Sequence, residues 1–180
     1  MKAWHNPLPL DLLPSTDPIS FMYMNKGETA LPLSPHPGSF GFRRKHHTHE
    51  GIDLYAPPGT EVMCVEGGVV VVIEPFTGPL AGSPWWHDTQ AVFIEGDSGV
   101  VVYGEIIVSS QIDIGDNVKP GDVIGHLTPV LKKEKGRPAC MLHLELHEHG
   151  TRCAPGWEHD AERPITLRDP TCYLASAINC

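Results

Sequence analysis

Glycine and proline interrupt this chain so often that few stretches can hold a long helix. Each occurs 18 times in 180 residues. Between these breaks the apolar segments are short and rich in Val and Ile, which strands favour more than helices do. The length suits a single domain with its own hydrophobic core. We therefore predict one mostly β domain whose strands are joined by tight turns.

The same signals divide the chain into three parts. Residues 1–37 are proline-rich and predict an irregular arm with a short strand near "SFMYM". Residues 38–150 hold the apolar runs, including two predicted hairpins at 89–108 and 112–127. Residues 151–180 form an extension with a short helix, which begins with Asp169 as its cap and Pro170 in its first turn.

Charge and cysteine content narrow the functional classes. The net charge of −9 argues against a nucleic-acid partner and fits poorly with docking on anionic lipid. Five cysteines without a CxxC pair indicate neither a disulfide framework nor a cysteine-type zinc site, and Cys64 and Cys140 look like small buried residues. No apolar run approaches the ~20 residues that span a bilayer.

The first residues, "MKAWHNPLPLDLLPS", do not resemble a signal peptide. Pro, Asn and Asp interrupt what would be its apolar core. We therefore expect a cytoplasmic protein if the chain is complete, and an extracytoplasmic one if a leader was removed.

A strand with strict alternation is predicted at "MLHLELHEH", residues 141–149. Successive side chains of a strand point to opposite faces, so the leucines should enter the core. The other face would then carry imidazoles and a carboxylate, either towards a groove or towards solvent. The residues on that face are Met141, His143, Glu145, His147 and His149.

A second cluster lies in "HHTHEGID", where His49 precedes Asp53 by four residues. On a straight strand their Cα atoms would lie ~13 Å apart, too far to share one ion. The chain must bend between them, and Gly51 permits a bend. A catalytic zinc site commonly has two imidazoles and one carboxylate as ligands and leaves its fourth coordination position open. This pair would supply one imidazole and the carboxylate.

The motifs "FGFR…HEGIDLYAPPGTEV", "VVYGEI", "IGDNVKPGDVIGHL" and "MLHLELHEHG" resemble the lysostaphin-type (LytM-like) zinc peptidases over residues 38–150. Those enzymes cut peptide bonds in bacterial peptidoglycan. The resemblance implies a mostly antiparallel, barrel-sandwich-like β-sheet that lines a narrow groove. It also implies one Zn²⁺ at the groove floor, held by His49 and Asp53 of an HxxxD motif and by His143 of an HxH motif.

Two positions depart from the family pattern. Met141 stands where the first histidine of HxH is expected, and Glu105 stands in "YGEI" where the other groove histidine is expected. A carboxylate can act as general base beside zinc, so Glu105 is a candidate catalytic residue. His87 is a candidate replacement for the missing oxyanion stabiliser, whose loss is commonly worth ~2.7–4 kcal/mol.

Several neighbours receive supporting roles. Trp85 and Trp86, beside His87, are expected to line the groove together with Met141. Glu145 is expected to orient a metal ligand, and His147 to lie at the groove rim. The remaining assignments are structural: Arg43 completes the family's "FGxR", and His46 and His47 belong to a solvated loop.

Two functions remain open, and a third is disfavoured. The first is a zinc hydrolase in which metal-bound water attacks a peptide or amide carbonyl of a peptide or muropeptide-like substrate. The second is an inactive zinc domain that binds a ligand or partner in the same groove. A biotinyl- or lipoyl-type carrier would explain "IGDNVKPGDVIG" but not "HEGID". A peptidoglycan enzyme should also be exported, which conflicts with the missing signal peptide.

Overall fold

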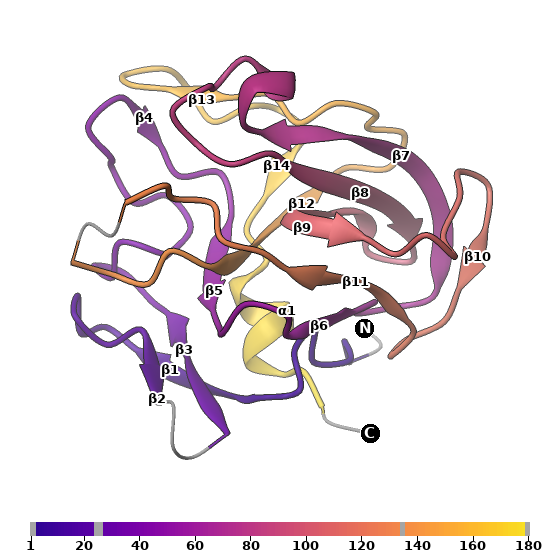
Figure 1. Cartoon of the computed structure of the whole chain (residues 1–180), viewed down its shortest axis with the longest axis horizontal. Helices are drawn as coiled ribbons and strands as arrows, with labels where there is room; N and C mark the ends of the chain where they lie inside the picture. The colour runs from indigo at the N-terminus through magenta and orange to yellow at the C-terminus, as the bar shows by residue number, and fades with distance from the viewer. Residues whose placement is uncertain (1–2, 24–26, 134–135, 179–180) are drawn as a thin grey trace.

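The structure is a computed structural model that describes residues 3–23, 27–133 and 136–178. A nine-stranded sheet dominates it (Figure 1). Six strands follow the order β10-β7-β8-β9-β11-β6, and β12 joins β9 to β5 and β14. Their bounds are β5 Ile52–Tyr55, β6 Glu61–Met63, β7 Gly68–Thr77, β8 Thr89–Gly96, β9 Gly99–Val108, β10 Asn117–Val118, β11 Val123–Leu127, β12 Met141–His147 and β14 Leu167–Arg168. All pairings in this sheet are antiparallel, so the predicted fold class is confirmed.

One of the two predicted hairpins forms. Strands β8 and β9 pair through a turn at residues 97–98, as the "GDSG" signal indicates. The hairpin predicted at 112–127 is wrong. There β10 pairs with β7, whereas β11 pairs with β6 and β9, because the turn between them sends the chain to another part of the sheet.

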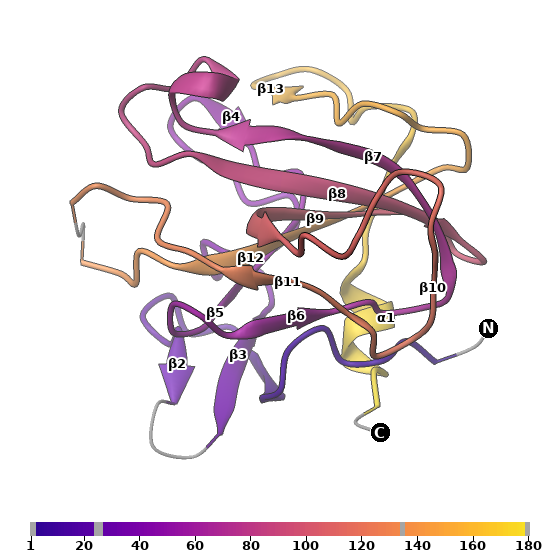
Figure 2. The same cartoon turned by 45° about the vertical axis from the view of Figure 1, so that its right-hand side comes forward.

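The N-terminal residues are more regular than predicted. Strands β1 (Asp11–Ser15), β2 (Met22–Tyr23) and β3 (Glu28–Pro32) form a small sheet in the order β1-β3-β2, drawn below the main sheet in Figure 2. Trp4, Leu8 and Leu31 belong to the main core. The N-terminal segment is therefore packed into the domain.

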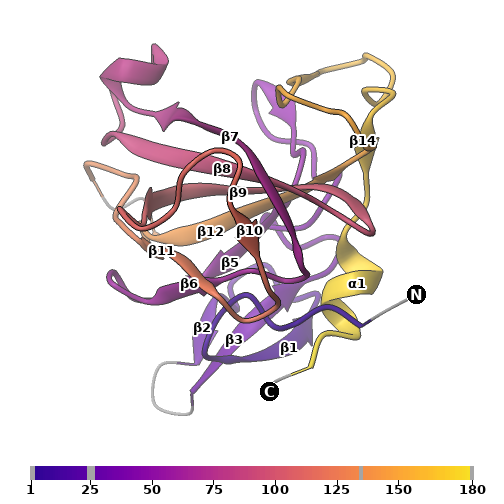
Figure 3. The same ribbon diagram turned by 90° about the vertical axis from the view of Figure 1, so that its right-hand side faces the viewer.

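The remaining elements are short. Strand β13 (Trp157–Glu158) pairs with β4 (His47–Thr48), and η1 (Pro79–Ala81) is a single 3₁₀ turn. The predicted helix is present as α1, Thr171–Ala175, but it begins one residue later than predicted, with Pro170 and not Asp169 at its N-cap. The Asp169 carboxylate still accepts a hydrogen bond from the Thr171 amide at 2.8 Å. The first described residues pack against α1 (Figure 3), where Trp4 stacks on Tyr173.

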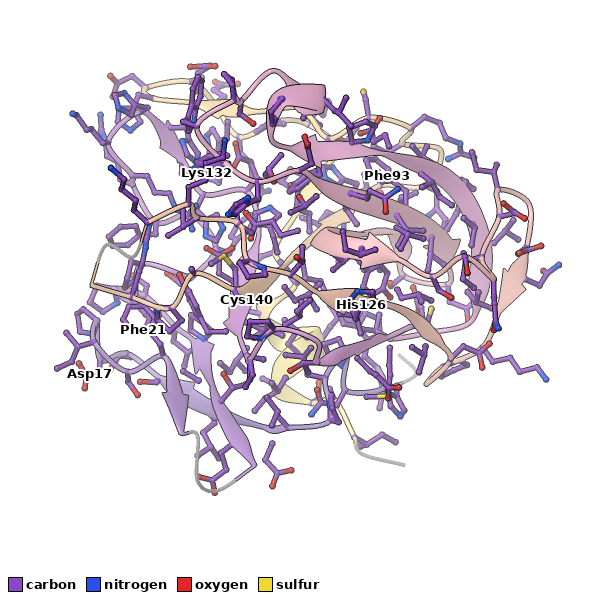
Figure 4. All side chains as sticks on the ribbon, in the orientation of Figure 1. Asp17, Phe21, Phe93, His126, Lys132 and Cys140 are labelled. Atoms are coloured by element: carbon purple, nitrogen blue, oxygen red, sulfur yellow. The ribbon has the colours of Figure 1, made fainter. Side chains whose placement is uncertain are left out.

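The two faces of β12 have different environments, as alternation predicts. Leu142, Leu144 and Leu146 enter the main core. The opposite face continues from the apolar cluster around Phe93, which is labelled in Figure 4, and it carries the polar residues of the site. Cys64 and Cys140 are buried, as expected. Within the described residues, no helix is both long and apolar enough to cross a membrane.

Candidate metal centre

The register of three strands brings the predicted ligands together. His143, in the middle of β12, pairs with Asp53 of β5 on one side and with Gly104 of β9 on the other. Directly paired residues in antiparallel strands share a face, so the Asp53 and His143 side chains are neighbours. His49 reaches the same point from the segment before β5.

Three donor atoms form a compact triangle. His49 Nε2 lies 3.0 Å from Asp53 Oδ1 and 3.2 Å from His143 Nδ1, and the third edge, His143 Nδ1 to Asp53 Oδ1, is 2.9 Å. In a tetrahedral zinc site with bonds of ~2.0–2.1 Å, two ligand atoms lie roughly 3.3 Å apart. The triangle therefore needs to widen by only a few tenths of an ångström to hold the ion.

Each imidazole has its remaining nitrogen fixed by another partner. His49 Nδ1 lies 2.9 Å from the Ser39 carbonyl oxygen, and His143 Nε2 lies 2.9 Å from Glu145 Oε1. These acceptors place the ring protons away from the triangle and leave His49 Nε2 and His143 Nδ1 free to bind a metal. Glu145 thus contacts a candidate metal ligand.

Gly51 contributes through close approach. A Cβ at this position would lie 2.5 Å from the Leu144 carbonyl oxygen and 3.0 Å from His143 Cε1. Its φ lies outside the left-handed region. The bend before β5 therefore needs a residue without a side chain, because the backbone of β12 and the His143 ring pass so close to it.

The donor set fits zinc. Two imidazoles and one carboxylate, all buried, provide three ligands of the kind found in hydrolytic zinc sites, with a fourth position available. A buried carboxylate oxygen nearby, Glu105 Oε2, has no hydrogen-bond partner among the described residues. Such an orphaned acceptor is expected where a water molecule or ion completes the site.

Arg44 is a site residue that the sequence did not single out. Its guanidinium forms an ion pair with Asp53 Oδ2, whereas Arg43 is exposed and pairs with Asp160 at 2.6 Å. Burial opposes ionisation of Asp53, but the neighbouring His49 and Arg44 side chains hold its pKa well below the ordinary value. The carboxylate is therefore ionised and ready to bind a cation.

Glu105 owes its position to a β-bulge. The pairing between β8 and β9 shifts register between Gln90↔Ile106 and Val92↔Tyr103, and Glu105 has a positive φ of 65°. Bulges re-aim side chains, often beside active sites. Burial and the charge of Asp53 raise the pKa of Glu105 to about 7.

A pocket of about 310 Å³ opens beside the triangle. His143, Glu145, Glu105 and Trp86 line it. The other lining residues come from three segments of the chain: Arg44, His47 and Glu50; Phe76 and Thr77; and Ala154, Pro155 and Gly156.

Four predicted groove residues are placed differently. His87 and Trp85 are exposed on the loop after η1 and do not line the pocket. Met141 is buried against Tyr55 and Val130. His147 is fully buried, because β14 covers the end of β12, and so it is not a rim residue.

His47 was expected in a solvated loop, but it lines the pocket. Residues 41–49 fold back on themselves, with Arg44 N donating to His47 O at 2.9 Å, and β4 is then held by β13. The carboxylate of Glu50 accepts a hydrogen bond from the Trp157 amide at 2.8 Å. Near Trp86, the Nζ atom of Lys132 (labelled in Figure 4) donates a hydrogen bond to the Pro84 carbonyl oxygen at 2.7 Å.

Comparison with known proteins gives a family and a fold. The sequence model described as "Peptidase family M23" matches residues 47–155. The catalytic domain of lysostaphin from Staphylococcus simulans, an antimicrobial peptidase, matches with a TM-score of 0.52 and 19% identity over 77% of this chain and 90% of that chain. A longer lysostaphin structure from the same organism matches with a TM-score of 0.54 and 19% identity over 77% of this chain and 49% of that chain. No curated protein matches this chain.

Proposed function

The chain belongs to peptidase family M23, and on that basis we propose that it is a zinc-dependent hydrolase of peptide or amide bonds. The observation that carries the proposal is the buried triangle of His49, Asp53 and His143. These residues would hold one zinc ion. A zinc ion in such a site supplies an activated water molecule and polarises the carbonyl under attack.

Glu105 is assigned the role of general base. It lines the pocket, has one oxygen without a partner among the described residues, and has a pKa of about 7 in the metal-free protein. A carboxylate with such a pKa can accept a proton at neutral pH, and a bound cation would keep it ionised. The bulge in β9 holds it at this place.

We assign to His47 the role that the sequence analysis proposed for His87. It is an imidazole in the pocket lining, whereas His87 lies outside it. Burial lowers the pKa of His47, although the charge of Glu50 opposes this. His47 would donate a hydrogen bond to the carbonyl oxygen or a proton to the leaving amine.

The substrate would be a peptide, with a muropeptide-like molecule as the first candidate. Trp86 and Phe76 offer apolar walls, and Arg44, Glu50 and Glu145 add polar groups. A pocket of about 310 Å³ that is open to solvent suits a short segment of an extended chain.

The test compares the zinc-loaded wild type with Glu105→Gln and His47→Ala on a panel of glycine-containing peptides and muropeptides. We expect turnover by the wild type and a 10²–10⁴-fold loss in Glu105→Gln, the usual size of a general-base contribution. Metal analysis should find zinc in the wild type and not in His143→Ala.

A non-catalytic zinc domain is the second candidate. It is favoured by the side chains at 105 and 141, which replace both auxiliary histidines of the family pattern, and by the burial of Met141. Zinc binding by the wild type without turnover of any substrate on the panel would support this function instead.

A further inference from the structure

A chain of hydrogen bonds leads from His143 along β12 to the C-terminal segment. His143 Nε2 lies 2.9 Å from Glu145 Oε1, and Glu145 Oε2 lies 2.6 Å from His147 Nε2. The other ring nitrogen of His147, Nδ1, lies 3.3 Å from Thr166 Oγ1. Four side chains are therefore joined in a row that starts at a candidate zinc ligand.

The directions of these hydrogen bonds agree with metal binding at His143. The carboxylate of Glu145 only accepts, so both histidines donate to it from Nε2. In a neutral imidazole the other nitrogen then carries a lone pair. For His147 that lone pair accepts from the Thr166 hydroxyl, and for His143 it points at the metal triangle.

The row is shielded from water by a segment outside the residues that match the family. The match ends at residue 155, and Thr166 lies beyond it. The Glu148 amide donates to Thr166 O at 2.8 Å, and β14 then pairs with the end of β12. As a result, His147 is 0% exposed and Glu145 is 3% exposed.

We propose that His147 and Thr166 are positioning residues for His143, so that the C-terminal segment sets the metal affinity of the site. The inference rests on the proposed zinc site. Glu145 is 3% exposed, so each of its two carboxylate oxygens needs a donor. With His147 in place the carboxylate is held at both ends, which fixes the ring of His143 in the orientation and tautomer that bind metal.

Without the donor from His147, one buried oxygen of Glu145 would lack a partner. The carboxylate would then turn to find water or another donor, and its hold on His143 Nε2 would weaken. His143 could move its proton to Nδ1, which blocks the lone pair needed by the metal. Metal binding would weaken even though every direct ligand was still present.

The experiment measures zinc affinity of the full chain by competition with a chelator and records the visible absorption spectrum of the cobalt-loaded protein. His147→Leu removes the donor, and His147→Gln retains an N–H donor of similar reach. We expect His147→Leu to bind zinc on the order of 10–100-fold more weakly, as for loss of other groups that support a ligand. His147→Gln should recover most of this affinity, and the cobalt spectrum should change in His147→Leu only.

Thr166→Val provides a second variant that leaves the packing nearly unchanged. It should weaken zinc binding about 2- to 10-fold, as expected for one neutral hydrogen bond. The matched control is Thr151→Val, because the Thr151 hydroxyl donates to the Glu148 carbonyl at 2.7 Å and takes no part in the row. Its zinc affinity should equal that of the wild type.

Two results would overturn the inference. Zinc affinity within twofold of wild type in both Thr166→Val and folded His147→Leu would do so directly, and Thr166→Val decides alone if His147→Leu does not fold. Wild-type protein that binds no zinc would overturn the metal site as well. The hydrolase proposal fails by a different result, absence of turnover, which leaves these affinities unaffected.

Discussion

Replacing Gly51 with alanine adds a single methyl group at the most crowded point of the candidate metal centre. The new Cβ would lie 2.5 Å from the Leu144 carbonyl oxygen and 3.0 Å from Cε1 and Nε2 of His143. The φ of Gly51 lies outside the left-handed region, so alanine meets no conformational penalty there. Any effect of Gly51→Ala therefore comes from the lack of space between β5 and β12.

The size of the effect follows from this contact. Carbon and carbonyl oxygen atoms in neighbouring strands lie ~3.3–3.6 Å apart, so the strands must separate by roughly 0.8 Å. His49 and Asp53 lie on one side of this gap and His143 on the other. Metal–ligand distances tolerate only about ±0.2 Å. We expect zinc affinity to fall on the order of 100-fold, and the overpacking to lower the free energy of unfolding by about 1–3 kcal/mol.

Urea unfolding of the metal-free protein and zinc titration against a chelator measure the two quantities separately. Gly156→Ala is the control, because its Cβ would meet only Glu50 Oε1 at 3.9 Å, although Gly156 lines the same pocket. Wild-type stability together with wild-type zinc affinity in Gly51→Ala would refute the close-approach argument.

Three further predictions concern single residues. Burial opposes ionisation of Glu145, but its hydrogen bonds lower its pKa to about 2. Glu145→Gln should therefore lower the free energy of unfolding of the metal-free protein by about 3 kcal/mol above pH 4.5. In urea unfolding, this difference from the wild type should vanish as the pH falls towards 2. Met141→His would place an imidazole in the buried apolar cluster with Tyr55 and Val130 and should lower the free energy of unfolding by about 1–3 kcal/mol in urea; wild-type stability would contradict this. Gly104→Ala would place a Cβ 2.5 Å from Phe76 Cε1 and should lower the midpoint of thermal unfolding, with a cost of about 1–3 kcal/mol.

Turn motifs in the sequence correctly predicted strand pairing only where the two strands are adjacent in the chain. The turn at 97–98 has two residues, so the pairing of β8 with β9 could be predicted from adjacent segments. The turn between β10 and β11 carries similar glycine and proline signals. Its strands nevertheless pair with partners far away in the chain, and turn signals contain no information about such partners.

The candidate site shows the same division. Alternation along β12 placed His143, Glu145 and His147 on one face, as observed. Burial of His147 depends on β14, which pairs with β12 from twenty residues away and leaves no periodic trace in the sequence. Arg44 was missed because Arg43 and Arg44 are adjacent, and only the fold of residues 41–49 decides which of them faces Asp53.

The position of β12 between two partner strands has a kinetic consequence. Its backbone pairs with β5 on one side and with β9 on the other, so amide protons around His143 should exchange with solvent only in large-scale openings. His49 follows the two-residue strand β4, which pairs only with the two-residue strand β13 among the described strands, and the segment is further held by the Arg43–Asp160 and Arg44–Asp53 ion pairs. Metal should therefore enter and leave by opening of residues 41–49. The stability of the β4–β13 pairing would then set the rate at which a chelator removes the metal from the protein.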